Sequence, residues 1–184
     1  MADVLGRALL IRARNAIAAE LGAPTAPEPD DPALREPGAT FVTLTQEGHL
    51  RGCIGSLQAS RPLDLDVRSN ARAAAFGDPR FAPLRPAELQ RTRIEVSLLS
   101  PAVPIEFTDE QDAIAKLRPD IDGVILEWDG KRGTFLPQVW ENLHEPHLFL
   151  NLLKQKAGLP ADFWAPDVRL YRYEVQKWKE PLRR

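Results

Sequence analysis

The only cysteine of the chain, Cys53, lies in residues 49–57, which read HLRGCIGSL. Alternate side chains of a β-strand share a face, so Arg51 and Cys53 would point the same way. Their Cα atoms would lie about 6.6 Å apart, close enough for the guanidinium to favour the thiolate form of the cysteine. This pair therefore predicts a nucleophilic or redox thiol.

The partners that such a thiol would need are harder to find. His49 would lie on the same face but about 13 Å away, too far to act as a base within an undistorted strand. Glu95 or Glu141 could transfer protons instead. Because no complete set of nucleophile, acid and base can be assembled, we favour a binding or accessory module and keep an enzyme that uses Cys53 as the alternative.

The glycines beside the cysteine support the binding hypothesis. Gly52 and Gly55 weaken a strand, and glycines in strands often mark a bulge or a place where a ligand or another backbone approaches closely. We predict that both bind a ligand or partner, together with Ser56. The alternative is that Cys53 is a small buried packing residue, since free cysteines are often buried.

A second notable turn reads GDPRF, and in it we predict Asp78, Arg80 and Phe81 as binding residues. The competing interpretation is an Asp-Pro turn with a surface ion pair. Metal binding finds little support, because the HEPH stretch with His144 and His147 lacks the HExxH spacing and contains a proline. We predict no metal and no cofactor.

Composition and charge narrow the function classes. The 184 residues are 43% hydrophobic and 27% charged, which is ordinary for a globular domain. The formal net charge of −2 disfavours nucleic-acid binding, and only short basic stretches of the sequence support it. No apolar run is long enough to span a bilayer, and one cysteine permits no internal disulfide, so we predict a cytoplasmic protein.

The pattern of elements predicts an α+β fold with antiparallel sheet and packed helices. Residues 4–21 have helical periodicity, with Asp3 as N-cap and a stop at Gly22. Residues 23–38 contain five prolines and are predicted to be a surface connection. A hairpin is expected from residue 41 to 57, and a helix capped by Ser60 should follow it.

The second half of the chain predicts further helices, strands and a hairpin. Residues 92–99 alternate as a strand, and Thr108 with Gln111 has the spacing of a capping box at a helix start. A second hairpin is expected around DGKR, a helix from Pro146, and one final strand over residues 168–178.

Six segments together resemble a known family. They read LRGCIGSL, AAAFGDPRFAPL, IEVSLLSP, DGVILE, GTFLPQVW and KAGLP, in this order. They closely resemble the AmmeMemoRadiSam system protein A family of AMMECR-type domains, from about Val4 to Trp178. Any one segment alone is weak, whereas RGCIG, DPRF and LPQVW together are highly specific.

The resemblance implies one AMMECR-type domain over residues 1–184, built of a larger and a smaller subdomain. It implies that the motif segments, including Gln138 and Trp140 of LPQVW, gather along a cleft that could hold a small molecule or peptide. It also implies a radical SAM protein and a Memo-type, dioxygenase-like protein as partners. It brings no established biochemical activity with it.

Overall fold

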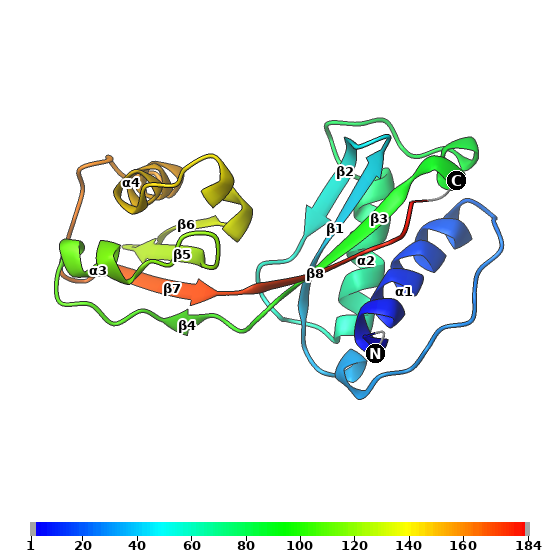
Figure 1. The fold of residues 1–184 in the computed structure, drawn as a ribbon, viewed down its shortest axis with the longest axis horizontal. Helices are drawn as coiled ribbons and strands as arrows, with labels where there is room; N and C mark the ends of the chain where they lie inside the picture. The colour runs from blue at the N-terminus through cyan, green and yellow to red at the C-terminus, as the bar shows by residue number, and fades with distance from the viewer. Residues whose placement is uncertain (1–2, 183–184) are drawn as a thin grey trace. The chain divides into compact units, whose positions relative to one another are not determined.

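The computed structural model describes residues 3–182, so the first two and last two residues of the predicted domain lie outside it. The predicted α+β class is confirmed, because helices accompany two four-stranded sheets whose paired strands run antiparallel (Figure 1). The described residues form two compact units: a first unit of residues 3–99 and 176–182, and a second unit of residues 100–175. No helix within residues 3–182 is long and apolar enough to cross a membrane.

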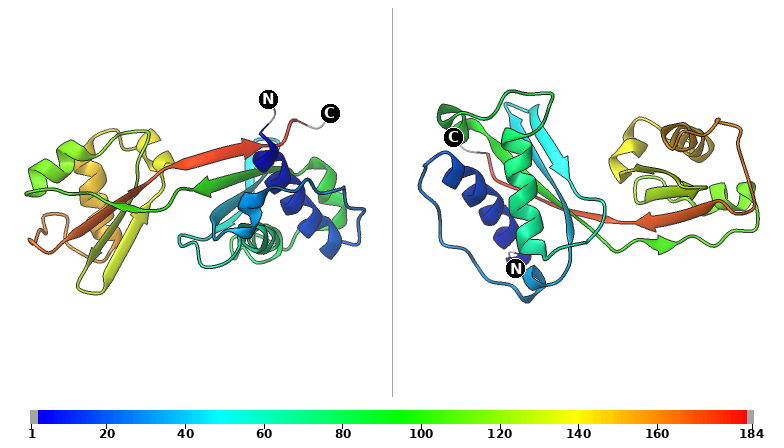
Figure 2. Two further views of the ribbon diagram at one scale, coloured as in Figure 1. Left: turned by 90° about the horizontal axis from the view of Figure 1, so that it is seen from below. Right: turned by 180° about the vertical axis from the view of Figure 1, so that it is seen from behind.

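The first unit is a sheet with two helices on one face. Its strand order is β2-β1-β3-β8, and its strands are β1 (Ala39–Gln46), β2 (His49–Gly55), β3 (Arg93–Leu99) and β8 (Val175–Lys179). Helices α1 (Val4–Glu20) and α2 (Leu63–Phe76) pack against each other and cover the same face of the sheet (Figure 2). Apolar side chains of this face, among them Val42, Ile94 and Val96, are fully buried against the helices.

The helix starts show how local sequence sets the boundaries. Asp3 caps α1 as predicted, because its side chain accepts a hydrogen bond from the amide of Gly6. The prediction of Ser60 as the cap of α2 is wrong: Pro62 occupies the N-cap, and the helix starts at Leu63 without a side-chain cap. Instead, the negative charges of Asp64 and Asp66 in its first turn interact favourably with the positive end of the helix dipole.

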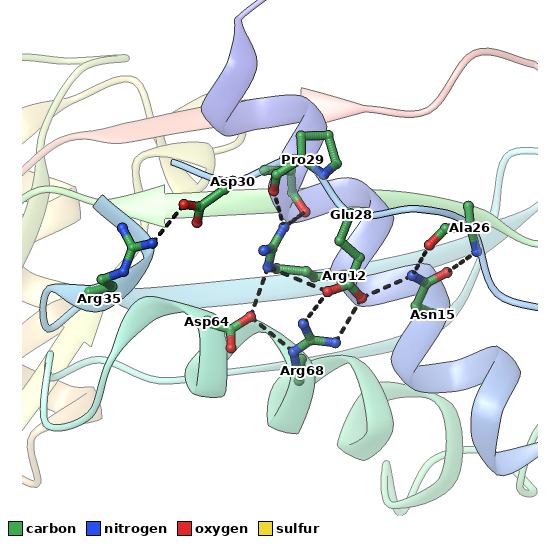
Figure 3. Close-up of polar contacts among 10 residues, drawn as sticks. Arg12, Asn15, Ala26, Glu28, Pro29, Asp30, Arg35, Asp64 and Arg68 are labelled. Carbon is green, nitrogen blue, oxygen red and sulfur yellow. Dashed lines mark hydrogen bonds and ion pairs between the residues drawn. The ribbon is translucent and has the colours of Figure 1, made fainter. Parts of the chain in front are cut away.

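The proline-rich connection has no regular structure before the short 3₁₀ helix η1 (Pro32–Arg35), and side chains of both helices hold it in place (Figure 3). Arg12 of α1 donates to the carbonyl of Pro29 at 2.6 Å, and Asn15 exchanges two hydrogen bonds with the backbone of Ala26. Arg68 of α2 forms an ion pair with Glu28. The connection is therefore fixed by polar contacts where prolines prevent strand pairing.

The second unit has strand order β4-β7-β5-β6, with β4 (Val103–Pro104), β5 (Gly123–Trp128), β6 (Lys131–Phe135) and β7 (Arg169–Tyr173). Its helices are α3 (Glu110–Lys116) and α4 (Pro146–Lys156), and the latter begins at the predicted proline. The predicted hairpin is confirmed, because Asp129 and Gly130 both have positive φ, as a two-residue type I′ turn requires. The prediction of Thr108 as a helix cap is wrong by one residue, since Asp109 occupies that position and accepts from the amide of Asp112.

The end of the chain departs from the predicted single strand. Residues 169–173 form β7 in the sheet of the second unit, and residues 175–179 form β8 in the sheet of the first. The alternating pattern predicts extended backbone but does not say which sheet a strand joins.

Candidate functional site

A row of polar side chains crosses the first sheet on the face opposite the helices. Thr43 of β1 lies opposite Cys53 of β2 on one side and Glu95 of β3 on the other. The Thr43 Oγ1 and Cys53 Sγ atoms are 3.3 Å apart, and Lys179 of β8 places its Nζ 3.6 Å from Glu95 Oε2. Directly opposed residues share a face, so the sheet aligns a thiol, a hydroxyl, a carboxylate and an ammonium.

The row leaves the sulfur partly exposed. Cys53 is neither fully buried nor fully exposed. Glu95 is two strands away, about 9.5 Å between backbones, with Thr43 in between. Among residues 3–182, the hydroxyl of Thr43 is therefore the group that hydrogen-bonds to the sulfur.

Arg51 is separated from the thiol by a β-bulge. Leu44 pairs with Gly52 and Thr45 with Leu50, so Arg51 is an extra residue without a partner on β1. Its guanidinium turns to Glu88 of the 3₁₀ helix η2 (Pro86–Arg91), with Nε 3.1 Å from Oε1. This cation is therefore already paired with a carboxylate. Its role beside the thiol remains a prediction.

The edge of β2 is capped by the GDPRF turn. Asp78 accepts a hydrogen bond from the Cys53 amide at 3.0 Å, while Arg80 Nη2 lies 3.5 Å from the Cys53 carbonyl. Arg80 also donates to both oxygens of Asp78, and these hydrogen bonds, together with that from the Cys53 amide, hold the pKa of this carboxyl well below its ordinary value. The turn therefore satisfies the backbone that an edge strand would otherwise leave open at Cys53.

Phe81 lies between two cations at this edge. Its ring centroid is 5.9 Å from Cζ of Arg51 and 5.5 Å from Cζ of Arg80, within the range of cation–π contacts. The Arg80 side chain is 55% exposed, and Leu50 on the neighbouring stretch of β2 is an exposed apolar side chain. We call Leu50, Cys53, Asp78, Arg80 and Phe81 the β2 edge surface.

The predicted binding glycines have neighbours within the protein. A Cβ on Gly52 would lie 2.1 Å from the carbonyl oxygen of Ala74 in α2, and one on Gly55 would lie 2.2 Å from Cγ of Phe41. Close approach of another backbone and of an aromatic ring thus accounts for both glycines. Their role in binding remains a prediction.

Ser56 belongs to a buried polar network at the start of α2. Its Oγ donates to Asp66 at 2.7 Å and accepts from Asn70 at 3.0 Å. Asp66 also accepts from the amide and hydroxyl of Thr40. The hydroxyl of Ser56 therefore joins strand to helix, and its predicted contact with a ligand remains a prediction.

The other predicted residues belong to the second unit. Gln138, Trp140 and Glu141 lie in the 3₁₀ helix η3 (Pro137–Glu141), where Gln138 and Glu141 are exposed. Trp140 is fully buried, stacks on Phe149 with ring centroids 3.7 Å apart, and donates to a backbone carbonyl at 2.8 Å. Their roles in binding and proton transfer remain predictions.

Three contributors to the site were missed in the sequence. Thr43 and Lys179 reach the row only through strand register, which one strand's pattern does not give. Glu88 stands in a turn-rich stretch and gave no sign of pairing with Arg51. Among residues 3–182, no group of three or more His, Cys, Asp or Glu side chains could hold a metal ion.

Glu88→Gln is expected to lower the free energy of unfolding by about 2 kcal/mol at neutral pH, because the enclosed Arg51 guanidinium loses its counter-charge. The hydrogen bond from Arg51, the largest cause, lowers the pKa of Glu88 from 4.5 to about 2. A carboxyl with a lowered pKa stabilises the fold above its unfolded pKa and loses that contribution as the pH falls from 4.5 to about 2. Urea unfolding at several pH values should therefore show a stability gap near neutral pH that narrows in this window. Equal stability of the two proteins near neutral pH would contradict the pairing.

Comparison with known proteins covers both units. The sequence model of the AMMECR1 family matches residues 10–178. A protein of Methanothermobacter thermautotrophicus is 41% identical over 180 residues, which are 95% of this chain and 94% of that protein. A protein of Thermotoga maritima is 40% identical over 153 residues, 82% of each chain. The crystal structure of an uncharacterized protein from Pyrococcus horikoshii matches with a TM-score of 0.83 and 32% identity, over 100% of this chain and 95% of that one.

Proposed function

The chain belongs to the AMMECR1 family, and from this premise we propose that it is a binding module that recognises a partner protein through the β2 edge surface. The proposed partners are a radical SAM protein and a Memo-type, dioxygenase-like protein, which the family resemblance supplies. The chain would act as an accessory to their chemistry and would perform none itself.

One observation carries the proposal: among residues 3–182, the hydrogen-bond partner of the Cys53 sulfur is a hydroxyl, that of Thr43. A nucleophilic thiol is commonly activated by an adjacent base or a lowered pKa. Here Arg51, the cation expected to supply activation, is paired with Glu88. The residue types at the edge, an exposed arginine and an aromatic ring, are those enriched where protein interfaces gain most of their affinity.

A thiol enzyme is the second candidate. It is favoured by the partial exposure of Cys53 and by Glu95, which follows Thr43 in the same row and could exchange protons across it. Without a substrate, this candidate is best tested through the thiol itself.

Cys53→Ala is expected to change the affinity for the partner by less than about threefold, because the β2 edge surface loses only one small polarizable atom, the sulfur. The measurement is titration calorimetry of the purified chain with the radical SAM protein and, separately, the Memo-type protein of the same organism. Thr43→Val is the matched control, since it removes the other half of the same hydrogen bond. Loss of association in Cys53→Ala but not in Thr43→Val would instead favour a mechanism that needs the thiol.

A further inference from the structure

The first unit contains a cavity of about 660 Å³ that has no part in the proposed function. It lies between α1, Ala26 of the proline-rich connection, and β8 with the two residues that follow it. Its volume falls within the roughly 300–1,000 Å³ usual for small-molecule sites. We propose that this cavity binds a small planar aromatic acid.

The apolar part of the cavity is built around Trp178. The indole lies so close to α1 that a Cβ on Gly6 would be 2.1 Å from the ring, and its Nε1 donates to Asp3 at 2.7 Å. Leu10 and Ile11 of α1 line the same cavity and are only partly buried. A fixed aromatic ring beside two aliphatic side chains favours a flat apolar ligand, because ring stacking adds to the burial of apolar area.

The charged residues that line the cavity indicate which kind of flat ligand would bind. Among residues 3–182, four cationic and two anionic residues line the cavity, an excess of positive charge in a chain whose net charge is −2. Both carboxylates have partners, since Arg14 binds Glu180 through two nitrogens and Asp3 receives the Trp178 indole N–H. Lys179 forms an ion pair with Glu95 on the opposite face of the sheet.

One cation of the cavity remains for a ligand. Arg7 of α1 is exposed and has no carboxylate within ion-pair distance among residues 3–182. Lys177 alternates with Trp178 along β8, so its side chain lies on the same face of the sheet as that of Lys179. Arg7 stands on the helix that also supplies the aliphatic wall. A ligand that combines a planar ring with a carboxylate would therefore satisfy both kinds of lining.

The wall formed by the connection is fixed in advance. Asn15 is buried, donates to the carbonyl of Ala26 at 2.8 Å and accepts from its amide at 2.9 Å, and Figure 3 shows these contacts. Its side chain also donates to Glu28, which Arg68 holds on the other side. Ligand binding thus needs no ordering of this segment, which lowers the entropic cost of association.

The test uses 2-naphthoate as the probe and uncharged 2-naphthamide as its matched control. Both are titrated into the ¹⁵N-labelled full chain while the four tryptophan indole N–H signals are followed, and Trp178→Phe assigns the signal of Trp178. We expect 2-naphthoate to shift that signal with a dissociation constant of about 1 mM or lower. The amide should bind roughly tenfold more weakly, because it cannot form charge-assisted contacts.

Two single variants complete the experiment. Arg7→Gln should weaken 2-naphthoate binding about tenfold and leave 2-naphthamide binding unchanged. Arg72→Gln removes the same charge from an exposed position outside the cavity lining and should leave both affinities as in the parent chain. The proposal is overturned if the Trp178 signal does not move with 2-naphthoate, if acid and amide bind equally, or if the two variants behave alike.

Discussion

Phe81→Ala is expected to weaken association with the partner protein about 100-fold, the effect of losing roughly 2.7 kcal/mol at a central aromatic contact. The ring is partly exposed and stands beside the exposed Arg80, so a partner that covers the ring can also contact the Arg80 guanidinium. Titration of the purified variant with each proposed partner measures the loss.

The matched control for this substitution is Leu65→Ala. Leu65 is an apolar side chain of α2 that is 54% exposed and lies outside the β2 edge surface. Its truncation should leave the affinity within about threefold of the parent chain. The proposal for the β2 edge surface fails if Phe81→Ala binds as well as Leu65→Ala while both variants keep the thermal unfolding of the parent.

Gly52→Ala is expected to reduce the free energy of unfolding by about 3 kcal/mol or more. Its new Cβ would lie 2.1 Å from the carbonyl oxygen of Ala74, an atom of the helix backbone that α2 cannot move without shifting against β1 and β2. Urea unfolding followed by circular dichroism gives the value.

Gly55→Ala provides the internal comparison on the same strand. Its Cβ would meet the ring of Phe41, a partly exposed side chain that can turn away, so the cost should be clearly smaller. A Gly52→Ala variant as stable as Gly55→Ala would show that β2 and α2 do not pack as closely as described.

Local signals in the sequence predict the elements better than their partners. The Asp3 cap, the turn at Asp129 and Gly130, and the helix from Pro146 follow from backbone preferences of a few residues and are confirmed. The division of residues 169–179 between two sheets depends on contacts across the whole chain, and strand periodicity contains no information on it.

In the candidate site, too, the local sequence pattern does not predict which residues come into contact. Strand alternation placed Arg51 and Cys53 on one face, which holds only in a regular ladder. The bulge at Arg51 changes the alternation and lets its guanidinium reach Glu88, 37 residues further along the chain. Which carboxylate this partly buried arginine contacts depends on the tertiary fold, so the sequence could propose the cation but not its partner.

For the two glycines of β2, the sequence predicted a close approach but not the group that approaches. Residue type indicated that something approaches β2 closely at Gly52 and Gly55. It could not distinguish a ligand from the protein's own backbone, and the structure places Ala74 and Phe41 there. The exposed Arg80 and the partly exposed Phe81 are consequently the better probes of recognition.

Alkylation of Cys53 measured with and without the partner tests the central claim most directly, because this is the only thiol in the chain and needs no substitution. The rate of iodoacetamide addition, read from the mass of this chain, should fall at least about tenfold in saturating radical SAM or Memo-type protein if the β2 edge surface is the interface. An unchanged rate at concentrations where a complex has formed would contradict the claim.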